Sequence, residues 1–155
     1  MICEDVVVDA SRRLGEVASE LDATWRLVTT LRVNLISLEN QAERLVISIK
    51  SLRREIRANE KDFAMLTGWL DGVTNEPYRK DLMESVQAIG EEEKVAARRL
   101  AWRERRLVSL RVKIESTGAE IVALDNRLGE LASSQGIILG KLADTFSGEE
   151  VLGCG

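Results

Sequence analysis

The sequence predicts an all-α fold: a long antiparallel hairpin of two coiled-coil helices. Apolar residues recur with a seven-residue period in both halves of the 155-residue chain, and the one proline lies near the midpoint. The composition agrees, because 31% of the residues are charged and 4% are aromatic, as is typical of long-helix proteins. We therefore expect one hairpin domain over residues 1–155.

The first helix is expected over about residues 5–71. With Val7 as the first position a of the heptad abcdefg, every position a through Leu70 is apolar. Position d is polar only at Thr24 and Asn59. A strict seven-residue period over this length, with no insertion, predicts a left-handed coiled coil.

The second helix is expected over about residues 77–146, with position a at Val86 and position d at Leu82. Its heptads keep their register but include more polar residues, among them Glu93 and Arg103. The remaining residues, 147–155, are rich in glycine and acids, and we expect them to form a flexible tail.

The connection is expected at about residues 72–76, within the stretch LDGVTNEPYRK. Gly72 suits a left-handed residue that ends a helix. Asn75 suits the N-cap of the next helix, with Pro77 in its first turn. A short connection makes consecutive helices antiparallel neighbours.

A hairpin with this turn pairs residues whose numbers sum to about 152, so that position a of one helix faces position d of the other. Asn59 then faces Glu93, and we predict that this polar layer sets the register of the two helices. The heptads alone leave open a parallel dimer, and also the pairing of two hairpins into a four-helix bundle.

The same register brings the two cysteines, Cys3 and Cys154, to the same end of the hairpin. A disulfide between them is geometrically conceivable. We expect free thiols instead, because both lie near chain ends in a protein expected to be cytoplasmic.

The sequence argues against an enzyme. It contains no histidine, no cysteine cluster and no glycine-rich phosphate loop, so we expect no catalytic residue, cofactor or metal site. No apolar run reaches 18 residues, so we expect no membrane insertion. The acidic start of the chain does not resemble a signal peptide.

Charge and apolar residues beyond the heptad positions predict protein partners. A basic belt of net charge +10 carries two acids, Glu55 and Glu104, in a chain of net charge −4. It suits an acidic protein surface; nucleic acid is disfavoured, because the belt lacks interleaved aromatic residues. The cations of the basic belt are Arg44, Lys50, Arg53, Arg54, Arg57, Arg98, Arg99, Arg103, Arg105, Arg106, Arg111 and Lys113.

Apolar residues also lie outside the heptad positions a and d. They favour a contact face for a partner or for a second copy of the chain. This off-seam set comprises Trp25, Val33, Ile36, Ile47, Trp102, Val108, Val112, Ala119 and Val122. Near the turn, Met65, Trp69, Tyr78 and Met83 form a further cluster. It either closes the end of the core or binds a partner as an exposed tip.

The two heptad helices, the central turn and the Arg-rich segment ARRLAWRERRLVSLRVK together resemble the central stalk proteins of bacterial type III secretion and flagellar export. The resemblance covers the whole chain and is one of architecture and charge. It implies a rod that engages the export ATPase ring, the export gate or free chaperones. A self-associating scaffold and a secreted effector that binds an acidic host protein are the alternatives.

Overall fold

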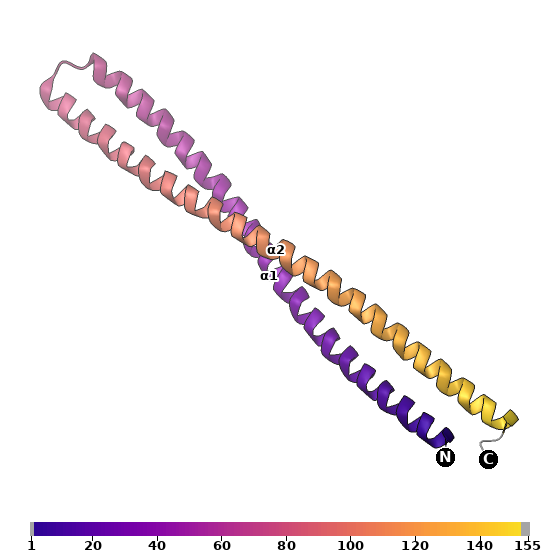
Figure 1. Ribbon diagram of the computed structural model, residues 1–155. Helices are drawn as coiled ribbons and strands as arrows, with labels where there is room; N and C mark the ends of the chain where they lie inside the picture. The colour runs from indigo at the N-terminus through magenta and orange to yellow at the C-terminus, as the bar shows by residue number, and fades with distance from the viewer. Residues whose placement is uncertain (1, 153–155) are drawn as a thin grey trace. The chain divides into compact units, whose positions relative to one another are not determined.

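The computed structural model describes the backbone of residues 2–152 and the side chains of residues 4–147. Within these residues the chain forms two long helices and no strands, an all-α helical hairpin (Figure 1). Helix α1 spans Ile2–Gly72 and helix α2 spans Glu76–Leu152. The side chain of Cys3 and the whole of Cys154 lie outside the described residues.

The chain divides into two units, each built from a segment of both helices. Unit 1 comprises Met1–Ile36 and Glu115–Gly155, and unit 2 comprises Ser37–Ile114. In unit 1, Arg32 pairs with Asp125 and Glu20 pairs with Arg127 across the helices. In unit 2, Arg53 pairs with Glu104 in the same way. The residue numbers of these pairs sum to between 147 and 157, around the predicted 152.

The cores of both units are narrow and lie at the predicted heptad positions. Every position a and d from Val7 to Leu70 and from Leu82 to Thr145 is buried or half-buried. The buried residues all belong to this set, and the cross-helix ion pairs flank it. The buried residues are Val28, Ile121 and Leu131 in unit 1 and Ile49, Leu52, Leu82, Ala96, Leu107 and Leu110 in unit 2.

The turn between the helices is shorter than expected, and Gly72 does not play its predicted part. Gly72 is the last residue of α1 and does not adopt a left-handed conformation. The helix instead ends where the Val73 N–H donates to the Leu70 carbonyl at 3.4 Å, a three-residue closure that needs no positive φ.

Asn75 precedes α2 as predicted, and its carbonyl accepts the Arg79 N–H at 2.8 Å, the first bond of the helix. Pro77 lies in the first turn of α2, where its missing N–H removes no helical hydrogen bond. Helix α2 continues to Leu152, beyond residue 146 where the sequence placed its end. One glycine in that segment, Gly148, costs a helix about 1 kcal/mol, which is not enough to end it.

Candidate protein-binding surfaces

Three arginines of the basic belt line one groove in unit 2, together with Trp102. Arg98, Arg99, Trp102 and Arg103 line a groove of about 330 Å³ on α2. One turn further along α2, the Arg106 guanidinium carbon lies 5.8 Å from the centre of the Trp102 ring, a cation–π contact. We call these five residues the Arg–Trp surface.

The Arg–Trp surface is open to solvent around an aromatic centre. Trp102 is 56% exposed although it is a large apolar side chain. Arg98, Arg99 and Arg106 are exposed, and no acidic side chain among the described residues forms an ion pair with them. Arg103 differs, because it is half-buried at a heptad position and donates a long hydrogen bond of 3.4 Å to the Ser48 carbonyl of α1.

Ion pairing differs sharply between the two units. Unit 1 has six Lys/Arg against 13 Asp/Glu, a net charge of −7; unit 2 has 16 against 13, a net charge of +3. Of the six cations of unit 1, only Lys141 lacks an ion pair among the described residues. Of the 16 in unit 2, only Arg53 and Lys94 have one.

The basic belt lies wholly within unit 2, and its charge is left largely uncompensated. Arg53, bonded to Glu104 at 2.8 Å, is its only member with an ion pair in the described part of the chain. Since the other cations of the belt have no such partner, the belt presents a positive surface that its own acids do not neutralise.

Of the two alternatives for the cluster near the turn, the exposure of Trp69, Tyr78 and Met83 argues against closure of the end of the core. Trp69, Tyr78 and Met83 are each more than half exposed, at 53%, 56% and 53%. They project outward because they occupy the heptad positions that flank the core, while the neighbouring Leu82 fills it. Met83 lines a groove of about 510 Å³ with Glu76, Pro77, Arg79 and Lys80; Trp69 and Tyr78 do not.

The predicted polar layer contains an unpaired oxygen. Asn59 and Glu93 are both half-buried in unit 2. Glu93 Oε1 is buried and has no hydrogen-bond partner among the described residues, so Asn59 does not satisfy it. Close by, Gly90 would place a Cβ 3.8 Å from the Phe63 ring, which supports the predicted register at this level.

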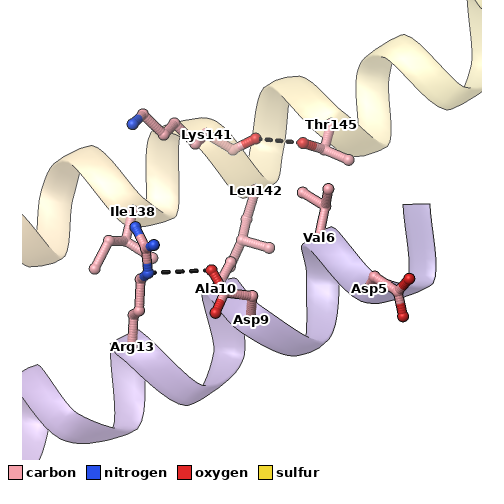
Figure 2. Close-up of a pocket in the computed structure, with 9 residues that line it drawn as sticks. All are labelled: Asp5, Val6, Asp9, Ala10, Arg13, Ile138, Lys141, Leu142 and Thr145. Atoms are coloured by element: carbon pink, nitrogen blue, oxygen red, sulfur yellow. Dashed lines mark hydrogen bonds and ion pairs between the residues drawn. The ribbon is translucent and has the colours of Figure 1, made fainter. Parts of the chain in front are cut away.

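Unit 1 contains a groove that the heptad pattern does not predict. It has a volume of about 390 Å³ and lies between the beginning of α1 and the end of α2 (Figure 2). Its apolar lining comes from Val6, Ala10, Ile138 and Leu142. The signal in the sequence was Ala10 at position d, because a small side chain there leaves the space beside Leu142 unfilled.

Part of the polar rim of this groove is paired within its own helices, whereas Asp5 and Lys141 form no ion pair among the described residues. Arg13 contacts Asp9 at 3.1 Å, and the Thr145 hydroxyl donates to the Lys141 carbonyl at 2.8 Å (Figure 2). The hydrogen bond from Arg12, with the charges of Arg13 and Arg12, holds the pKa of Asp9 below its ordinary value, although partial desolvation opposes the shift. These contacts leave the groove less charged than the Arg–Trp surface.

Within the described residues, no group of three or more cysteine or acidic side chains is arranged to hold a metal ion. No described helix is long and apolar enough to cross a membrane. Comparison of the chain with protein-family models, with curated proteins and with solved structures found no match.

Proposed function

We propose that this chain is a non-enzymatic protein-interaction hairpin that binds an acidic polypeptide surface through the Arg–Trp surface of unit 2. One observation carries the proposal. Nearly all the cations of unit 1 are neutralised within the chain, whereas every belt cation of unit 2 except Arg53 lacks an acidic partner among the described residues. Exposed charges of one sign that are not paired internally attract and orient a partner of the opposite sign.

The composition of the surface favours a protein partner. Arginine and tryptophan are enriched where protein interfaces gain most of their binding energy, because both combine a large contact area with directed polar groups. Trp102 offers an exposed ring beside which an apolar side chain of the partner can pack. Arg98, Arg99 and Arg106 surround it with donors for carboxylates.

The partner is therefore expected to carry both carboxylates and an apolar side chain on one face. An amphipathic helix rich in Glu and Leu meets this description and provides a defined probe. Nucleic acid is the competing class, and its binding depends on stacked aromatics along the strand. The Arg–Trp surface contains a single aromatic residue.

The test is a fluorescence titration that follows Trp102 alone. The variant Trp25→Phe/Trp69→Phe retains only this tryptophan, since the chain has three. A synthetic Glu/Leu amphipathic peptide is expected to change its emission on binding. In that background, Arg99→Glu/Arg106→Glu is expected to raise the Kd at least about tenfold, because two attractive charges become repulsive.

The matched control is Arg79→Glu/Lys80→Glu, which makes the same change in net charge near the turn. It is expected to change the Kd less than about twofold, because exposed charges a Debye length away are screened. An equal rise in the Kd of both variants would mean that binding depends only on the net charge of the chain. A rise in the control alone would mean that the peptide binds near the turn. Tighter binding of single-stranded DNA than of the peptide would replace the protein partner with nucleic acid.

The resemblance to export stalk proteins supports a more specific role. We propose that the acidic partner belongs to a bacterial type III export apparatus, with its ATPase as the first candidate. Purified export ATPase is accordingly the second probe in the same titration, and the Arg99/Arg106 variant is expected to bind it less tightly. If the chain binds the peptide but not the ATPase, the proposed stalk role is wrong, whereas binding of an acidic partner through the Arg–Trp surface is still supported.

A further inference from the structure

Helix α2 carries a second apolar stripe outside its core. Ala101, Val108, Val112, Ala119 and Val122 are all exposed, and the three valines are each 60% exposed. With Arg105 and Glu115 they follow alternating steps of four and three residues, the spacing that keeps side chains on one face of a helix. We call these seven residues the outer stripe.

The outer stripe shares no residue with the core of the hairpin. The core positions of the same segment include Leu107, Leu110 and Ile121, which are buried against α1. Because α2 is a single helix from Glu76 to Leu152, its own geometry places the outer stripe on one face. The stripe therefore has the pattern of a helix-pairing seam and no partner in this chain.

We infer that the outer stripe pairs with the same stripe of a second copy of this chain, in antiparallel orientation. In this dimer the two-fold axis lies at the level of Leu110 along α2. Val108 then lies opposite Val112 of the second copy. Ala101 lies opposite Ala119 of the second copy, and Arg105 lies opposite Glu115 of the second copy. A two-fold axis makes every contact twice, so this stripe is complementary to itself.

Charge selects the antiparallel orientation. A parallel, in-register pair would set Arg105 against Arg105 and Glu115 against Glu115 inside the seam, and like charges there oppose association. The antiparallel pair converts both repulsions into attractions. Neither Arg105 nor Glu115 forms an ion pair within the described chain, so both are available for this contact.

The dimer leaves Arg99, Trp102 and Arg106 of the Arg–Trp surface uncovered, whereas Arg98 lies opposite Val122 of the second copy at the end of the seam. Arg99, Trp102 and Arg106 follow their own three-and-four spacing on a different side of α2 from Val108 and Val112. The seam from Ala101 to Val122 is about 33 Å long at 1.5 Å per residue. A contact between single helices of this length belongs to the small interface class, so we expect a weak dimer that forms only at high protein concentration.

The test is sedimentation equilibrium of the full chain up to several hundred micromolar, with reciprocal charge reversals. Arg105→Glu alone and Glu115→Arg alone are each expected to raise the dimer Kd at least about tenfold, because each sets like charges in opposition twice. The double variant Arg105→Glu/Glu115→Arg restores the two attractive pairs and is expected to return to within about threefold of the original Kd.

A mixture of the two single variants is expected to form a mixed dimer, because each then meets an opposite charge. Lys61→Glu, an exposed change away from the stripe, serves as the control and is expected to leave the Kd unchanged. Circular dichroism of each variant checks that the helices are retained. A chain that stays monomeric at the highest concentration overturns the inference, as does a double variant no better than the single ones.

Discussion

At the scale of single residues, Glu93 is the least well accommodated side chain. It occupies a predicted core position of α2, and its Oε1 atom is buried without a hydrogen-bond partner among the described residues. Asn59 was predicted to meet it across the core and is half-buried as expected. The heptad pattern could place both residues in the core, but it could not determine whether their polar atoms would meet.

Replacing Asn59 and Glu93 tests how much these polar residues destabilise the hairpin and whether they set the register of its helices. Asn59→Leu/Glu93→Leu is expected to raise the free energy of unfolding by about 1–3 kcal/mol, because the desolvation penalty of an unpaired polar group disappears. Urea denaturation monitored by circular dichroism measures the change. Glu92→Leu, an exposed neighbour, is the control and is expected to change it little.

The same variant tests whether the polar layer sets the register. Ala42→Cys and Leu110→Cys report the pairing by disulfide formation, in a background where Cys3 and Cys154 are replaced by serine. If the layer sets the register, cross-linking falls when Asn59 and Glu93 become leucine. Cross-linking that stays as efficient as before would mean that the leucine positions alone specify the register.

At the scale of elements, the two helices were predictable because the hydrophobic period is long and unbroken. The core of each unit falls at the predicted positions, from Val28 to Leu131. The helix ends were less predictable, because Gly72 and Gly148 both lie within helices. Local signals for ending a helix are weak compared with the packing of a whole apolar stripe.

Gly68 offers a direct test of helix propensity near the end of α1. It has no left-handed backbone, and a Cβ added there would meet no atom within 4 Å. Gly68→Ala is therefore expected to raise the free energy of unfolding by about 1 kcal/mol, since glycine loses more backbone entropy in a helix. Urea denaturation measures this free energy of unfolding. The control is Gly72→Ala at the last residue of α1, which is expected to raise the free energy of unfolding by a smaller amount.

A decrease in stability for Gly68→Ala would contradict this explanation of the α1 terminus. Such a decrease would mean that the segment before the turn requires the backbone flexibility of glycine at position 68. Trp69, which follows Gly68 and is 53% exposed, would then be held by a less regular backbone than α1 has in the structure.

At the scale of the whole molecule, the charge of the chain is unevenly distributed. The basic belt could be located from the sequence, and both of its segments fall in unit 2. The groove formed by Arg98, Arg99, Trp102 and Arg103 could not be found from heptad positions, because it depends on side-chain conformations. The identity of the partner is not encoded in the periodicity, since a surface charge specifies only the sign of what binds it.

The most direct test of the proposed function is the salt dependence of peptide binding by the Trp25→Phe/Trp69→Phe variant. If unpaired arginines hold an acidic partner, raising the salt from about 0.05 M to about 0.5 M is expected to weaken binding at least about tenfold, because salt screens exposed charges. The Arg99→Glu/Arg106→Glu derivative is expected to bind weakly at both salt concentrations. Equal affinity of the parent variant at low and high salt would contradict binding through the Arg–Trp surface.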